Sequence, residues 1–178
     1  MIEFVIWVIP SFIYAFVQKR KREWESILHS LGATWGDKKS HAIGLGIFLL
    51  VCVLSAIVFQ LMPEDVFGSL GDSFTRVTSI GAGIVIALRA FGEEVFFRGF
   101  LGGFLMRRLG FLAGNTLQAV IFLLPHLSLL ILNTGLCPIV VLQFFLGWVL
   151  GWLRHYSGSF LPGAVAHMAT NIAVTFLV

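Results

Sequence analysis

The chain has 178 residues, of which 58% are hydrophobic and 12% are charged, and its mean hydropathy is +0.94. A soluble protein of this size could not bury so much apolar surface, so the composition predicts a polytopic membrane protein. The formal net charge of +3 comes from short basic clusters between apolar runs, which argues against a nucleic-acid partner. Because no internal repeat or polar domain is visible, residues 1–178 are expected to form a single integral-membrane domain.

Six apolar segments follow one another along the chain, and each approaches the roughly 20 residues that a membrane-spanning helix needs. They cover residues 2–17, 41–62, 77–106, 111–132, 138–153 and 160–178. Between the first two, apolar residues recur at three- and four-residue steps, namely Trp24, Ile27, Leu28, Leu31 and Trp35. This spacing predicts a short amphipathic helix in the cytosolic interface. The predicted fold is an all-α membrane bundle of about six transmembrane helices plus this interfacial helix.

The basic residues between the spans predict the orientation of the chain. One side of the six spans receives Lys19, Arg20, Lys21, Arg22, Lys38, Lys39, Arg107, Arg108 and Arg154. A loop on the other side carries the acidic residues Glu64, Asp65 and Asp72 against a single Arg76. Because cytoplasmic loops are enriched in Lys and Arg, we expect both termini outside and the basic clusters in the cytosol of a prokaryotic plasma membrane.

The third span contains the stretch Gly92-Glu93-Glu94-Val95-Phe96-Phe97-Arg98-Gly99. A charge at bilayer depth costs roughly 2.5–3.5 kcal/mol on insertion scales, so such residues are rare and usually functional. Glu94 and Arg98 are four residues apart, which predicts an ion pair along one helical face. Glu93 points about 100° away from Glu94 and is expected to be free for another task. The span also exceeds the hydrocarbon thickness, so we expect it to be tilted or broken, with Gly92 as the candidate weak point.

Other polar side chains at membrane depth are His126 in the fourth span, and His167 with Asn171 on one face of the sixth. Together with Glu93 they could form one site, in which a carboxylate and an imidazole activate water while a second imidazole and an amide stabilise an oxyanion. A metal such as zinc, bound by Glu93, His126 and His167, is the alternative. The metal-free arrangement is preferred, because the chain has no HExxH helix and the ligands would come from three separate spans. Taken singly, each of these groups could also be an interhelical hydrogen bond.

Three motifs in this order and spacing resemble the CPBP family of intramembrane proteases, which includes the CAAX prenyl endopeptidases and bacterial Abi-type proteins. The motifs are Glu93-Glu94-x-x-x-Arg98, Phe122-x-x-x-His126 and His167-x-x-x-Asn171, and the likeness covers residues 77–178, the expected catalytic core.

The resemblance implies an all-helical fold with a cavity open toward the cytosol, where a peptide bond is hydrolysed. It implies that Glu93 activates water with the help of His126, that His167 and Asn171 stabilise the tetrahedral intermediate, and that Glu94 and Arg98 support the site. It leaves the cofactor open between none and a divalent metal.

Arg89 departs from the family pattern, which has an apolar residue at this position more often. It is expected either to pair with Glu93, four residues later, or to bind a substrate carboxylate. The expected partners of the chain are membrane lipid and a membrane-anchored or hydrophobic peptide substrate. Two other functions stay open: a non-catalytic peptide-binding immunity protein, and a small proton or ion transporter with a relay through Glu93, His126 and His167.

Overall fold

The structure is a computed structural model that describes residues 2–69 and 77–177. Helices make up 86% of it, and the described residues contain no strand, which confirms the all-α prediction. The elements are α1 (Ile2–Lys19), α2 (Trp24–Leu31), α3 (Lys38–Leu61), α4 (Glu64–Gly68), α5 (Ile80–Glu94), η2 (Val95–Gly102), α6 (Gly103–Leu109), α7 (Phe111–Leu123), η3 (Leu124–Ser128), α8 (Leu129–Leu132), η4 (Thr134–Leu136), α9 (Cys137–Ser157) and α10 (Leu161–Val174).

Four helices in the described part of the chain are long and apolar enough to cross a membrane, namely Ile2–Lys19, Lys38–Leu61, Phe111–Leu132 and Thr134–Ser157. The predicted third and sixth spans are not among these four helices. The third contains the charged stretch, and α10, in the sixth, has only 14 residues. The count of six therefore stays a prediction. Asp72 and Arg76, which belong to the predicted outer loop, lie outside the described residues.

The predicted amphipathic helix is present as α2, but its apolar stripe is divided between two environments. Ile27 and Leu31 are buried in a cluster with Ala15 of α1, against which Tyr14 and Phe100 pack. By contrast, Trp24 and Leu28 are exposed, and so is Trp35, which lies beyond the helix end. One side of α2 thus seals the bundle, while the other side is available to lipid.

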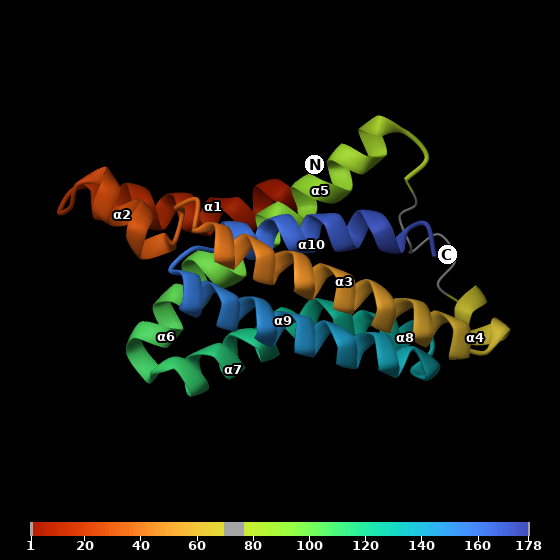
Figure 1. Cartoon of the computed structure of the whole chain (residues 1–178). Coiled ribbons are helices and arrows are strands. Elements are labelled where there is room, and N and C mark those ends of the chain that lie inside the picture. Colours follow the sequence, from red (N-terminus) through yellow and green to blue (C-terminus); the bar gives the residue numbers. More distant parts are fainter. Residues whose placement is uncertain (1, 70–76, 178) are drawn as a thin grey trace.

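The charged helix does not break at Gly92, so that part of the prediction is wrong. The chain stays α-helical to Glu94 and then forms the π-helix η2, whose wider turns are common at functional sites. Gly92 instead allows α1 to approach, because a Cβ at this position would lie 3.0 Å from the Phe4 ring and 3.3 Å from its backbone. In Figure 1 the chain changes direction between α5 and α6, on either side of η2.

The packing of the long helices brings distant parts of the chain together. α10 packs against both α3 and α5, and α9 packs against α7. Figure 1 shows α10 between α5 and α3, with α9 on the far side of α3 from α5. The polar residues on α5, η3 and α10 are therefore positioned by a common framework of packed helices.

Close packing of α6 against α7 depends on Gly114. A Cβ at this position would lie 2.6 Å from backbone atoms of Leu105 and Met106, and backbone cannot give way as a flexible side chain can. We expect Gly114→Ala to lower the free energy of unfolding by about 1–3 kcal/mol, measured by detergent-induced unfolding. Gly46→Ala is the matched control, because nothing lies within 4 Å of its new Cβ. Equal stability of the two variants would contradict this packing.

Candidate active site

A fully buried ion pair lies at the end of α5 and is shared with α10. Arg98 Nη1 lies 2.7 Å from Glu94 Oε1, and both side chains are 0% exposed, so the predicted pair is present. His167 Nδ1 lies 2.8 Å from the same carboxylate oxygen. Arg98 Nη2 also donates to the carbonyl oxygen of Gly147 at 3.3 Å, and its guanidinium carbon lies 4.2 Å from the centre of the Phe122 ring. The pair thus connects α5 and η2 to α7, α9 and α10.

Glu93 takes no part in the Glu94–Arg98 pair, but it is not without a partner, because it forms an ion pair with Arg89. Its Oε1 lies 3.3 Å from Arg89 Nε, and the same nitrogen lies 3.2 Å from Oε2 of Glu3 on α1. Of the two roles expected for Arg89, pairing with Glu93 is the one that the structure contains. The Glu93 side chain is only 7% exposed, whereas those of Arg89 and Glu3 are about half exposed. The network therefore runs from the surface to a buried carboxylate.

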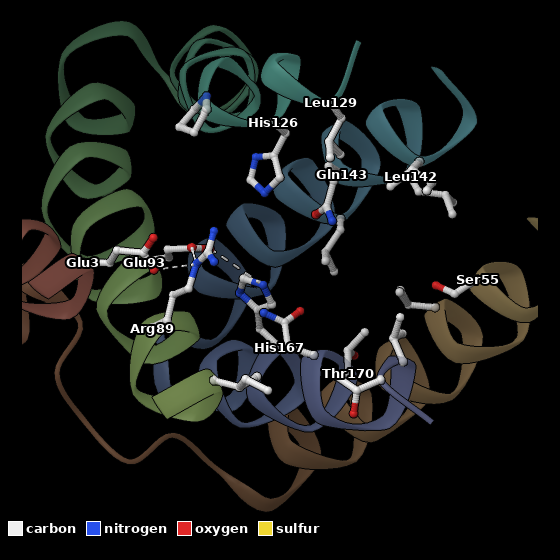
Figure 2. Close-up of a pocket in the computed structure, with 18 of the residues that line it drawn as sticks. Glu3, Ser55, Arg89, Glu93, His126, Leu129, Leu142, Gln143, His167 and Thr170 are labelled. Atoms are coloured by element: carbon white, nitrogen blue, oxygen red, sulfur yellow. Dashed lines mark hydrogen bonds and ion pairs between the residues drawn. The ribbon is translucent and has the colours of Figure 1, made fainter. Parts of the chain in front are cut away.

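The two histidines present their Nε2 atoms from opposite sides of the site. His126 Nδ1 lies 3.0 Å from the carbonyl oxygen of Phe122, which only accepts, so Nδ1 donates. His167 Nδ1 likewise donates to Glu94. In both neutral rings Nε2 then carries a lone pair rather than a hydrogen. Figure 2 shows His126 and His167 on facing walls.

His167 Nε2 lies 4.0 Å from Glu93 Oε2. This separation is too long for a direct hydrogen bond, but both atoms can contact the same water molecule. The geometry also restricts the role expected for His167: its Nε2 can donate to an oxyanion only when both ring nitrogens carry a proton.

A cavity of about 650 Å³ contains all four expected catalytic residues in its lining, together with Arg89. Cavities of 300–1,000 Å³ are typical of ligand sites. Its other walls are mostly apolar and come from α1, α3, α5, α8, α9 and α10, including Trp7, Val58, Ile86, Leu129 and Leu146. Glu94 and Arg98 do not line the cavity, which agrees with the supporting role that the resemblance implies for them.

The expected metal ligands are not arranged as a binding site. Among the described residues, no group of three or more His, Cys, Asp or Glu side chains is placed to hold a metal ion. Glu93, His126 and His167 are all described residues, and they do not form such a group in this structure. The choice between a metal-free and a metal-dependent reaction stays a prediction.

Two cavity residues were missed by the sequence analysis. Gln143 lines the cavity from α9, and its Oε1 is buried without a hydrogen-bond partner. Figure 2 shows it among the residues that line the cavity. A buried amide oxygen is normally satisfied by protein, water or ligand, so Gln143 is available to a substrate N–H. The sequence feature that could have identified Gln143 is that it is a single amide side chain within an apolar segment. Glu3, an acidic residue in the first span, gave a comparable signal.

A family model described as type II CAAX prenyl endopeptidase Rce1-like matches residues 75–173. The chain belongs to this family. The matched region is more than half of the chain, and it includes all three motifs and most of the cavity walls. Membership in the Rce1-like family confirms the resemblance and makes the protein an intramembrane endopeptidase in general terms. No curated protein and no solved structure matches the chain.

The two arginines of this Rce1-like site differ in burial, which predicts different effects on stability. Arg98→Met leaves Glu94 buried without its cation, and loss of one partner from a buried pair costs about 3–5 kcal/mol. Arg89→Met is the comparison variant, because Arg89 and its partner Glu3 are about half exposed and its other partner, the 7% exposed Glu93, lines the cavity rather than the packed interior. We therefore expect a smaller loss, since exposed pairs contribute about 0–1 kcal/mol. Detergent-induced unfolding of both variants measures the difference. Equal losses would show that the Glu94–Arg98 pair is not buried as described.

Proposed function

We propose that the protein hydrolyses a peptide bond in a membrane-associated or hydrophobic peptide, with Glu93 as the base that activates water. The observation that carries this proposal is the convergence of Glu93, His126, His167 and Asn171 on one cavity, although they come from α5, η3 and α10. An isolated buried carboxylate is costly, and a site of this composition supplies the groups that general-base hydrolysis needs.

The reaction begins with a water molecule that donates one hydrogen bond to Glu93 Oε2, which lies 4.0 Å from His167 Nε2. His126 Nε2, on the facing wall, accepts the other hydrogen of this water and so helps to orient it. Glu93 takes one proton as the water oxygen bonds to the carbonyl carbon. The protonated Glu93 then returns this proton to the amide nitrogen as the carbon–nitrogen bond breaks, so that a carboxylic acid and an amine leave.

The charge that develops on the carbonyl oxygen needs hydrogen-bond donors. The Asn171 amide supplies N–H groups from the cavity wall, one helical turn beyond His167. His167 becomes a second donor when its Nε2 is protonated, and the Glu94 carboxylate on Nδ1 stabilises that charged ring. Glu94 and Arg98 are positioning residues in this account, because they act on the substrate only through His167.

Arg89 and Gln143 provide substrate contacts. Arg89 is held by Glu3 and Glu93, and a substrate carboxylate could replace the exposed Glu3. Gln143 Oε1 accepts a substrate N–H in place of the partner that it lacks. The apolar walls receive the side chains of a hydrophobic peptide.

Replacing Glu93 with Gln tests the proposal, because the amide keeps the shape of the side chain but cannot take the proton. We expect Glu93→Gln to reduce cleavage of a quenched-fluorescence library of hydrophobic peptides by about 10²–10⁴-fold, in line with the usual contribution of a general base. Peptide binding should persist. Glu64→Gln, at an exposed acidic residue of α4, is the matched control and should cleave normally.

Four outcomes contradict this mechanism. Unchanged cleavage by Glu93→Gln removes Glu93 as the base. Peptide binding without cleavage by the parent protein favours the immunity function, while proton flux in proteoliposomes that depends on Glu93 favours the transporter. A parallel assay addresses the cofactor: activity that a chelator abolishes and zinc restores would overturn the metal-free mechanism.

A further inference from the structure

Basic side chains gather at one end of the helix bundle. In Figure 1, α2, α6 and the start of α3 lie together at this end. The basic residues where α1 and α6 end, where α3 begins and near the end of α9 are Lys19, Arg20, Lys21, Arg22, Lys38, Lys39, Arg107, Arg108 and Arg154. The ion pairs found within residues 2–69 and 77–177 all involve Arg89, Arg98 or His167, so no carboxylate in that part of the chain pairs with these cations.

Two of these arginines meet at a single oxygen atom. Arg107 Nη1 donates to the carbonyl oxygen of Ser30, in the last turn of α2, at 2.8 Å. Arg154 Nη2 donates to the same oxygen at 3.4 Å. A Cβ on Gly103 of α6 would lie 3.1 Å from the first of these nitrogens, 3.3 Å from the oxygen and 3.8 Å from the second nitrogen. Two like charges are therefore held together where α2, α6 and α9 meet.

The end of α2 does not balance both charges. A helix C-terminus carries about half a negative charge, which a single cation already exceeds. The backbone N–H groups of Gly32 and Ala33 also donate to carbonyl oxygens earlier in α2, at 2.9 and 2.8 Å, so those acceptors are used. The Ser30 oxygen has two lone pairs, whereas two guanidinium groups have five N–H donors each. Most of these donors need another acceptor.

The unused donors differ in how a ligand can reach them. Arg154 is 9% exposed, and its Nε is enclosed without a hydrogen-bond partner. Its Nη1 has no acceptor among the described residues either, but this nitrogen is not enclosed. Arg107 is exposed, and only its Nη1 donates to a described residue. Arg107 is therefore the outer arm of a candidate anion site, and Arg154 forms its base.

This pair of arginines lies at the headgroup level of a bilayer. α1 ends at Lys19, α3 begins at Lys38 and α9 ends at Ser157, and all three helices are long and apolar enough to cross a membrane. Trp24, on α2, and Trp35, shortly after it, are exposed, and tryptophan is enriched at the membrane interface. A phosphate group of a lipid is thus the anion that this level of the molecule meets.

An apolar surface for acyl chains lies next to Arg107 in the chain. Phe104 and Leu109 on α6 and Leu112 on α7 are all exposed. Exposed apolar side chains beside a basic pair can contact the two parts of a phospholipid at once, the hydrocarbon and the phosphate. A free phosphate ion would use only the second part.

We propose that Arg107 and Arg154 form a binding site for the phosphate group of an anionic phospholipid. The phosphate oxygens accept hydrogen bonds from the unused N–H groups of both arginines, and the acyl chains lie along the exposed side chains of α6 and α7. Basic pockets between membrane helices bind headgroups of this kind. The bound lipid joins α2 to α6 and α9. This site depends neither on the peptidase reaction nor on which side of the membrane the basic end faces.

Lipid-dependent stability tests the site with the full-length protein. The protein in a neutral detergent is titrated at fixed salt with phosphatidylglycerol, or with phosphatidylcholine that has the same acyl chains, and the thermal-unfolding midpoint is measured. A ligand that binds only the folded state raises this midpoint. We expect a saturable rise with phosphatidylglycerol and a much smaller one with phosphatidylcholine. Equal rises with the two lipids would overturn the proposal.

Two adjacent arginines separate a defined site from general attraction between charges. Arg107→Gln removes the outer arm of the site. Arg108→Gln is the matched control, because it removes the same charge from the next residue, whose guanidinium lies over the Phe104 ring. We expect Arg107→Gln to need about tenfold more phosphatidylglycerol for half of the maximal rise, as for a lost hydrogen bond to a charged group, and Arg108→Gln to stay within about twofold of the parent.

Each variant is compared with its own midpoint in phosphatidylcholine, so that a change in folding alone does not count. Equal losses of affinity in the two variants would show diffuse attraction and overturn the site. Inorganic phosphate, added without lipid, distinguishes the source of the anion. We expect it to leave the midpoint of the parent protein unchanged, because it has no acyl chains. A full rise with inorganic phosphate would overturn the assignment to a lipid.

Discussion

The Glu94–Arg98 ion pair is the interaction on which the rest of the site depends. Two charges in the interior of a membrane bundle are costly unless they are paired, and here Glu94 Oε2 and Arg98 Nε remain buried without a hydrogen-bond partner of their own. The i, i+4 spacing supplies the pair, and the Gly147 carbonyl and the Phe122 ring supply further contacts for the guanidinium. The carboxylate also receives His167 from α10, so the same pair joins two helices and determines which nitrogen of the imidazole faces the cavity.

The neighbouring glutamates differ because a helix turns about 100° per residue. Glu94 points into the packed interior, where it binds Arg98 and His167. Glu93 lines the cavity, and its Oε2 lies 4.0 Å from the Nε2 atom of His167. In the proposed mechanism, Glu94 therefore acts on the substrate only through His167. The Rce1-like region, residues 75–173, contains both glutamates and the cavity-lining residues His167, Thr170 and Asn171 of α10.

Relationships within one helix were predictable from the sequence, whereas relationships between helices mostly were not. Periodicity alone predicts the Glu94–Arg98 pair and the shared face of His167 and Asn171. The Glu3–Arg89 contact depends on how α1 lies against α5, which no local pattern encodes. Gly92 likewise looked like a hinge because its role as a contact point for Phe4 is visible only in three dimensions. The motifs identified the cavity residues through their resemblance to a family, but only the packed helices show that these residues line one cavity.

The most direct test of the account is the energetic coupling between Glu94 and His167, which are 73 residues apart in the chain. A double-mutant cycle with Glu94→Gln and His167→Leu, measured by detergent-induced unfolding, reports whether the two side chains meet in the folded protein. Because a hydrogen bond to a charged group contributes about 1.5–3 kcal/mol, we expect the double variant to lose less stability than the two single losses combined, by about that amount. Losses that add to within about 0.5 kcal/mol would show that these side chains do not meet, and the site described here would not exist.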